Sequence, residues 1–166
     1  MALASIKPLF VFEHNDMLKF KSEVLATCIE IVKEKIDVAE KELQKLDSSQ
    51  ASETKSSMGD KYETSREMMQ RERDTLNANL QNNKTLLSQL LYIDLTKTFT
   101  KAETGSLIET EQGFYFVSVG LGKVIVNNQT VFVISALSPI GKLLVGNSKG
   151  NIITFNGQKL TLGEIL

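Results

Sequence analysis

The sequence predicts an α+β fold in which an antiparallel coiled-coil hairpin of two helices precedes a small antiparallel sheet with one short helix. Up to residue 95, apolar residues recur at heptad spacing and glycine occurs once, at Gly59. From residue 96 onward, glycine becomes frequent, and β-branched and aromatic residues form short runs. This change of pattern predicts a hairpin domain, residues 1–95, and a sheet domain, residues 96–166.

The first arm of the hairpin carries a narrow apolar seam. One series of apolar residues recurs at every seventh position, and a second series is offset from it by four. Alternating steps of three and four residues are typical of a coiled coil, and the Glu and Lys residues between them belong to a solvent-exposed face. The two series are Leu18, Leu25, Val32, Ala39 and Leu46, and Ile29, Ile36 and Leu43.

The pattern resumes after a Ser-rich break between Asp47 and Asp60, which predicts a turn with its tip at about residues 50–62. Two arms of similar length fold back on each other most simply as a monomeric antiparallel hairpin. A parallel homodimer through the arms is the alternative, and the break between the seams argues against it. At 1.5 Å per residue, arms of about thirty residues reach roughly 45 Å. The second seam comprises Met69, Leu76, Asn83 and Leu90, and Arg73, Leu80 and Leu87.

The second half of the chain is typical of short strands joined by tight turns. Strand-like runs cover residues 113–119, 123–126, 129–134, 151–155 and 158–162, and a further strand begins within 105–108. Asn127-Asn128 and Asn156-Gly157 are the expected hairpin turns. Between the two hairpins, Ser138 is the expected N-cap and Pro139 lies in the first turn of a short helix at residues 140–145.

Composition excludes several classes of function. The net charge is −1, from 19 basic and 20 acidic side chains, so we expect contact with nucleic acid only indirectly. The single cysteine, Cys28, excludes an intramolecular disulfide and a Cys-based metal site, and its apolar neighbours predict a buried thiol. No run approaches the roughly 18 apolar residues of a membrane span, and residues 1–12 lack the features of a signal peptide. We therefore expect a cytoplasmic protein without membrane contact.

Two acidic residues, Asp60 and Glu63, begin the second arm at the predicted tip. They are three residues apart, so a helix places their side chains on one face. Two carboxylates at the end of an exposed probe are able to share a hard cation such as Mg²⁺, which keeps waters or phosphate oxygens as its other ligands. The alternative is structural, because Asp at an N-cap and Glu three residues later form a capping box that stabilises a helix by about 1 kcal/mol.

Two separated motifs resemble those of the Gre family of bacterial transcription elongation factors. The run GDKYETSREMMQRE is similar to the family's Gly-Asp-Leu-x-Glu-Asn motif near the coiled-coil tip, with Gly59, Asp60 and Glu63 matching. The run SPIGKLLVGNSKGN is similar to a second family motif, and the two motifs stand in the family's order. The matching residues of the second motif are Ser138, Pro139, Lys142, Leu144, Gly146, Gly150 and Asn151.

The resemblance implies a fold and a mechanism. The C-terminal domain is expected to be FKBP-like and to dock on RNA polymerase at the rim of the secondary channel, with Ser138, Pro139 and Lys142 binding the partner. The hairpin is expected to enter the channel, where Asp60 and Glu63 help to hold a second Mg²⁺ in the polymerase active site and promote cleavage of a backtracked transcript. The protein is then a cofactor of RNA polymerase and not an enzyme, and it holds no stable cofactor alone.

The first motif also departs from the family pattern, because residues 64–67 after Glu63 and Lys61 after Asp60 differ from the usual ones. A channel-binding factor that modulates the active site without cleavage therefore stays open beside cleavage stimulation. Two other classes are a coiled-coil adaptor whose seam contacts another helix and an FKBP-like peptidyl-prolyl isomerase. An isomerase needs a deep aromatic pocket, whereas the alternating aromatic residues of the predicted strands are explained more simply as core.

Overall fold

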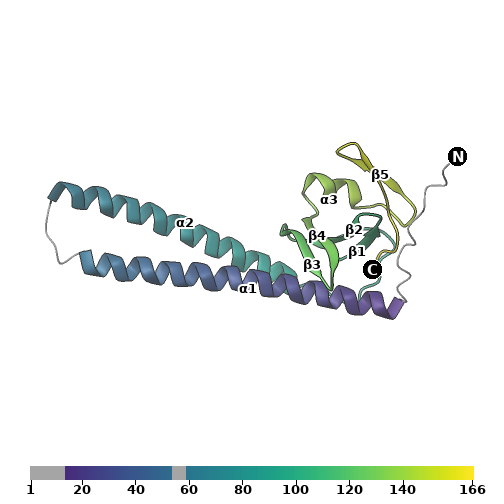
Figure 1. Ribbon diagram of the computed structural model, residues 1–166, viewed down its shortest axis with the longest axis horizontal. Helices are drawn as coiled ribbons and strands as arrows, with labels where there is room; N and C mark the ends of the chain where they lie inside the picture. Colours follow the sequence, from purple (N-terminus) through teal and green to yellow (C-terminus); the bar gives the residue numbers. More distant parts are fainter. Residues whose placement is uncertain (1–13, 54–58) are drawn as a thin grey trace. The chain divides into compact units, whose positions relative to one another are not determined.

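The computed structural model describes residues 14–53 and 59–166, and its architecture is α+β, as the sequence predicts (Figure 1). In chain order, its elements are two long helices, four strands, a short helix and two further strands. Contacts divide the described residues into two compact units. One unit comprises residues 29–91, and the other comprises residues 14–28 together with residues 92–166.

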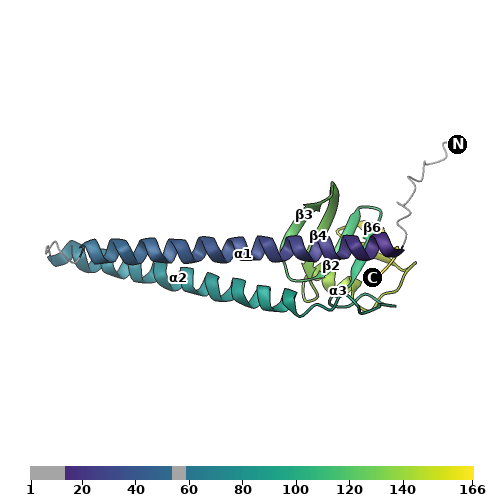
Figure 2. The same cartoon turned by 90° about the horizontal axis from the view of Figure 1, so that it is seen from below.

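Residues 29–91 form an antiparallel helical hairpin, which confirms the prediction from the heptad pattern (Figures 1 and 2). Its arms are α1 (His14–Glu53), from residue 29 onward, and α2 (Gly59–Leu91). The Glu and Lys residues between positions 33 and 45 are exposed, as expected for the outer face of a coiled coil. Along the seam, Val32, Ala39, Leu80 and Leu90 are buried, and Ile29, Ile36, Leu43, Leu46, Met69, Arg73, Leu76, Asn83 and Leu87 are half-buried.

Residues 92–166 contain two small sheets and a short helix. A four-stranded sheet has the order β1-β2-β4-β3, and β5 pairs with β6 in a separate antiparallel ribbon. The helix α3 (Pro139–Leu144) contacts β4 and β5. The strands are β1 (Leu107–Thr110), β2 (Gly113–Ser118), β3 (Gly122–Val126), β4 (Gln129–Ser135), β5 (Ile152–Phe155) and β6 (Gln158–Thr161).

The larger sheet is mixed, which corrects the antiparallel sheet expected from the sequence. β2 pairs in parallel with β4, in a register that places Phe114 opposite Val131, whereas the β1–β2 and β3–β4 pairs are antiparallel. The reason lies in the strand order, because β3 occupies the edge and β4 lies between it and β2. A hairpin turn specifies only the pair of strands that it joins. The sequence therefore predicts the β3–β4 hairpin but not which of its strands meets β2.

Backbone angles confirm both predicted hairpin turns. Asn127 and Asn128 have φ values of 48° and 62°, and Asn156 and Gly157 have φ values of 50° and 77°. Two successive residues with positive φ are characteristic of the type I′ turn, whose twist matches that of the strands it joins. These turns fix the registers of the β3–β4 and β5–β6 pairs.

The first part of α1 belongs to the same unit as the sheets. Met17 and Val24 are buried there, and the ring centroid of Phe20 lies 4.9 Å from that of Phe114 on β2. The heptad spacing continues through this segment, and α1 is accordingly one continuous helix from His14 to Glu53. Buried residues of the strands, of α3 and of the adjoining loops form a hydrophobic core. They are Ala102, Ile108, Tyr115, Val117, Ile140, Leu144, Ile153, Leu160 and Leu162.

Candidate functional site

The predicted tip carboxylates lie at the start of α2. The helix begins at Gly59, so Asp60 and Glu63 both fall within its first five residues. Glu63 is exposed to solvent. The side chain of Asp60 and residues 54–58 of the predicted tip lie outside the described part of the chain. Asp60 and Glu63 are three residues apart within α2.

The chemistry of two carboxylates limits what this end of the hairpin is able to bind. Carboxylate oxygens suit a hard cation such as Mg²⁺, which takes an octahedral shell of oxygen ligands. Asp60 and Glu63 supply only part of such a shell. Across residues 14–53 and 59–166, no group of three or more His, Cys, Asp or Glu residues is arranged to hold a metal ion. A cation at this tip would therefore need further ligands from water or from another molecule.

The alternative to metal binding is that the acids stabilise α2, but the start of the helix differs from the predicted capping box. Because α2 begins at Gly59, Asp60 stands in the first turn and not at the residue before it. An acidic side chain in a first turn complements the helix dipole by about 0.3–1 kcal/mol at an exposed site. This role is compatible with metal binding, because both need the carboxylate to be charged.

An open groove of about 640 Å³ follows the carboxylates along α2. Three of its lining residues, Lys61, Thr64 and Ser65, stand where the sequence departs from the Gre pattern. The others are Met68, Met69 and Glu72. The side chain of Met68 is 66% exposed, and sequence analysis missed it because one apolar residue off the seam gives no periodic signal. The start of α2 thus carries an amphipathic surface beside its acids.

The second motif forms the start of α3, where its residues have structural roles. Ser138 is the N-cap: its Oγ accepts a hydrogen bond from the backbone N–H of Gly141 at 3.1 Å and donates one to the carbonyl of Ser135 at 2.7 Å. Pro139 is the first helical residue, where the absent N–H leaves no helical hydrogen bond unmade. A Cβ on Gly141 would lie 2.1 Å from the Ser135 carbonyl oxygen. The predicted cap is confirmed, and the helix begins at Pro139.

The fold also explains the later residues of this motif, with the exception of Lys142. Leu144 is fully buried, and Gly146 and Gly150 have φ values of 88° and 85°, which favour glycine. The side chain of Lys142 is exposed, and no hydrogen bond or ion pair joins its ammonium group to another described residue. A basic side chain that the fold does not use is available to a partner.

Exposed apolar side chains also occur on α3, next to it in the chain, and on the strand β5. Leu137 is 80% exposed just before α3, and Leu143 and Val145 are exposed at its end. On β5, which contacts α3, Ile152 is 61% exposed. We call Leu137, Lys142, Leu143, Val145 and Ile152 the α3 surface. Exposed apolar residues that gather on one surface and are bordered by polar residues mark protein interaction sites.

The cysteine has no part in a site. Cys28 is fully buried, as predicted, and burial raises the pKa of its thiol to about 12. The thiolate, which is the reactive form, is therefore scarce at neutral pH. This excludes Cys28 as an accessible nucleophile in the folded protein.

Structure and site together define an α+β protein that carries an acidic pair at the start of the second hairpin arm and an exposed apolar and basic surface at α3. No protein-family model and no curated protein matches the chain. Among solved structures, the chain is similar to the transcription factor Gfh1, with 20% identity over 89% of this chain and 94% of that one, at a TM-score of 0.30. No helix among residues 14–53 and 59–91, or in the short α3, is long and apolar enough to cross a membrane.

Proposed function

We propose that this protein is a Gre-like transcription elongation factor that acts in the cytoplasm as a monomeric cofactor of RNA polymerase. The sheet unit binds the polymerase through the α3 surface, together with Ser138 and Pro139. The hairpin enters the secondary channel and brings Asp60 and Glu63 to the active site. The protein then stimulates cleavage of backtracked transcripts or otherwise modulates that site, and it is not itself an enzyme.

The observation that carries this proposal is the pairing of two motifs on two separate structural units. The acidic motif begins α2 of the hairpin, and the second motif forms α3 beside the sheets. Capping and close packing explain Ser138, Pro139 and Gly141, but they leave Lys142 and the apolar residues of the α3 surface unused. A docking surface on one unit and an acidic pair on the other fit a factor that contacts its partner through both units.

The tip carboxylates would act as ligands donated to another active site. Within the polymerase, Asp60 and Glu63 would provide oxygen ligands to Mg²⁺, with the remaining positions filled by water, transcript phosphate or polymerase residues. A metal ion held in this way orients and activates the attacking water in two-metal hydrolysis. This assignment requires both carboxylates to be charged and solvent-accessible, and Glu63 is exposed.

Modulation without cleavage is the second candidate function. The observation that favours it is the groove beside the acids, where Lys61 adds a positive charge next to Asp60 and Met68 is exposed. These side chains allow contacts with polymerase or transcript that occupy the channel without completing a metal site. Both candidate functions, cleavage and modulation without cleavage, include polymerase binding by the α3 surface. Whether the transcript is shortened therefore distinguishes them.

The test uses a cognate RNA polymerase elongation complex stalled in a backtracked state. The full-length protein is added beside variants Asp60→Asn and Glu63→Gln, which keep the size of each side chain and remove its charge. Glu67→Gln is the matched control, because Glu67 is an exposed acid four residues after Glu63 on α2. Shortened transcripts that need Asp60 and Glu63 but not Glu67 would establish the cleavage function.

Binding to the complex without shortened transcripts would establish a modulator in place of a cleavage factor. Absence of binding would refute the transcription function. The coiled-coil adaptor would then be the remaining interpretation, and a tight homodimer seen by analytical ultracentrifugation would favour it. The isomerase alternative finds no support in the aromatic residues, because Phe114, Tyr115 and Phe116 are buried as core.

A further inference from the structure

The apolar seam of the hairpin weakens toward its tip. Its buried apolar residues, Val32 and Ala39 on α1 and Leu80 and Leu90 on α2, all lie in the part of the hairpin away from Glu63. Beyond Ala39 on α1 and before Leu80 on α2, the described seam residues are half-buried. Burial of apolar surface therefore contributes less to holding the arms together near the tip than at the base.

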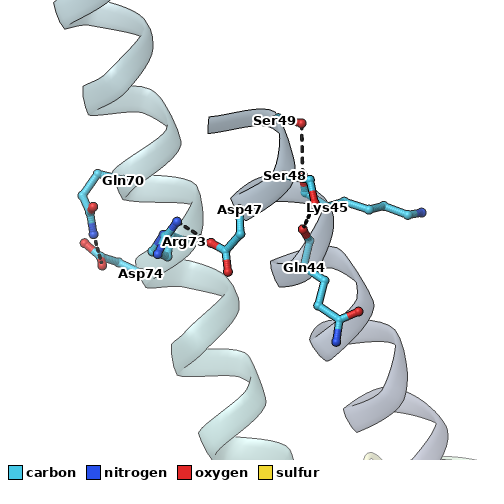
Figure 3. A network of polar contacts seen from close by, with 8 residues as sticks. All are labelled: Gln44, Lys45, Asp47, Ser48, Ser49, Gln70, Arg73 and Asp74. Carbon is cyan, nitrogen blue, oxygen red and sulfur yellow. Dashed lines mark hydrogen bonds and ion pairs between the residues drawn. The ribbon is translucent and has the colours of Figure 1, made fainter. Parts of the chain in front are cut away.

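Two ion pairs join the arms, and one of them lies in this weaker stretch. Arg73 of α2 pairs with Asp47 of α1, and Figure 3 shows its guanidinium directed across the gap between the helices. Nearer the base, Lys84 of α2 pairs with Glu40 of α1 at 3.1 Å. In both pairs, the acid stands on α1 and the base on α2. The other contacts drawn in Figure 3, such as that between Gln70 and Asp74, lie within one arm.

Arg73 stands in the seam itself. It precedes Leu80 and Leu87 by seven and fourteen residues, and its side chain is 31% exposed, so its stem packs between the arms while its charge reaches Asp47. Polar residues at seam positions specify the register of a coiled coil at some cost in stability. A partly exposed ion pair adds only about 0–1 kcal/mol of stability, so specificity is the larger effect to expect.

The two pairs together specify one alignment of the arms. A slip of one heptad keeps apolar residues in the seam, so the seam alone discriminates poorly between alignments. Slipping α2 in one direction would place Leu80 opposite Asp47 and Leu91 opposite Glu40. The opposite slip would offer Arg66 to Asp47 but would leave Glu40 opposite Asn77. Of these three alignments, only the observed one forms both ion pairs.

We propose that the Asp47–Arg73 pair is a register lock that positions the acids of the tip, with Asp47 and Arg73 as positioning residues for Asp60 and Glu63. A slip of one heptad would displace Glu63 along the hairpin by about 10 Å. Because a metal ligand must be placed to within about 0.5 Å, such a slip would remove Glu63 from a metal site. This inference rests on the proposed function for the metal role, whereas the register itself is measurable in the free protein.

Spin labels on the full-length protein measure the register. Lys45→Cys on α1 and Glu67→Cys on α2 provide exposed attachment sites, and the buried Cys28 stays unlabelled. Pulsed electron paramagnetic resonance then gives the distance between the arms in four backgrounds. These are the unchanged chain, Asp47→Arg, Arg73→Asp and the double exchange Asp47→Arg/Arg73→Asp.

One narrow distance is expected for the unchanged chain and for the double exchange. Each single change leaves two like charges facing each other, so we expect a broadened distribution with a second population from arms that have slipped by about 10 Å along the hairpin axis. The matched control is Asp37→Lys/Lys41→Asp, because that pair lies within α1 at 2.6 Å and does not join the arms. Single variants with an unchanged narrow distance, or a double exchange that fails to restore it, would overturn the register lock.

The same variants connect the register to the tip acids. In the backtracked-complex assay, each single change should raise the Mg²⁺ concentration needed for half-maximal cleavage several-fold. The affinity for polymerase should stay unchanged. The double exchange should return the Mg²⁺ requirement to that of the unchanged chain. If the single variants show a changed distance between the spin labels but the same Mg²⁺ dependence of cleavage, the positioning role is overturned and the register lock stands. If the unchanged chain cleaves nothing, the proposed function fails, and the distance measurement still decides the register.

Discussion

The ammonium group of Lys21 lies 4.4 Å from the centroid of the Phe99 ring, and the Lys21 side chain is fully buried. Its Nζ makes no hydrogen bond within the described part of the chain. Burial lowers the pKa of Lys21 to about 8, although the nearby charge of Asp94 acts to raise it. The lowered pKa means that desolvation outweighs the attraction of Asp94. The cation–π contact with Phe99 adds a favourable interaction of roughly 0.5–2 kcal/mol.

Lys21→Met should therefore stabilise the protein at pH 7. Methionine keeps the apolar stem and removes a buried unpaired donor, so the free energy of unfolding should rise by about 1–3 kcal/mol. Urea denaturation of both proteins gives this difference. The control is Lys97→Met, because Lys97 lies 5.0 Å from the same ring but is half exposed and paired with Glu103. A loss of stability in Lys21→Met would show that the cation–π contact dominates.

The dependence of stability on pH provides a second readout of Lys21. Its pKa is about 8 in the folded protein and 10.5 for an ordinary lysine, so the unfolded chain holds more protons between these values. The free energy of unfolding contributed by this group should therefore rise with pH from about 8 to 10.5 and stay flat below 8. Denaturation of the unchanged chain and of Lys21→Met across this range isolates the contribution. Parallel curves for the two proteins would contradict the assignment.

Gly141→Ala should disrupt the start of α3. The added Cβ would lie 2.1 Å from the carbonyl oxygen of Ser135, which is backbone and unable to rotate away. We expect a loss of about 1–3 kcal/mol or more, measured by thermal or urea denaturation. Gly120→Ala is the matched control, because a Cβ there meets no atom within 4 Å. Equal stability of the two variants would contradict the close packing of α3 on the end of β4.

The turn at Asn156 offers a test of backbone strain. Asn156 has a φ of 50°, which alanine tolerates less well than asparagine or glycine. Asn156→Ala should lower the free energy of unfolding by about 1 kcal/mol, and Asn156→Gly should change it by less. Urea denaturation of the pair separates the effect of φ from that of the lost amide. A larger loss in the glycine variant would show that side-chain bonding of Asn156 matters more than its backbone angle.

The sequence predicts those parts of the fold that depend on local patterns. The seam from Val32 to Leu46, the turns at Asn127-Asn128 and Asn156-Gly157, and the Ser138 cap follow from periodicity or turn chemistry, and the structure confirms each one. The parallel pairing of β2 with β4 was missed, because it joins strands that no single turn connects. Local chemistry specifies neighbours along the chain, whereas the strand order depends on packing of the whole sheet.

The sequence likewise predicts some features of the candidate site and not others. The spacing of Asp60 and Glu63 is visible in the sequence, and their place at the start of α2 follows from the Ser-rich break before them. The exposure of Leu137 and Ile152 was not predicted, because apolar residues beside a short helix are expected in a core. The Asp47–Arg73 pair was also missed, since pairing across the arms depends on their alignment. Contacts between residues that are far apart in the sequence can be identified only once the fold is known.

The α3 surface leads to the last prediction, which concerns polymerase binding. Lys142→Glu reverses an exposed charge that has no partner in the described part of the chain, and Leu143→Ser removes an exposed apolar side chain. Each change should weaken binding to the polymerase by about 1–2 kcal/mol, or roughly tenfold, without altering thermal stability. Fluorescence anisotropy of the labelled protein titrated with polymerase measures the affinity.

Lys123→Glu is the control for this prediction, because Lys123 is also an exposed lysine, on β3, and lies outside the α3 surface. If all three variants weaken binding equally, the effect comes from overall charge and not from a docking surface. Salt dependence separates the two causes further, because a general electrostatic attraction weakens steeply with ionic strength and contact by Leu143 does not. An affinity that falls for Lys142→Glu and Leu143→Ser but not for Lys123→Glu, at 0.15 M salt as well as at low salt, would locate the binding surface at α3.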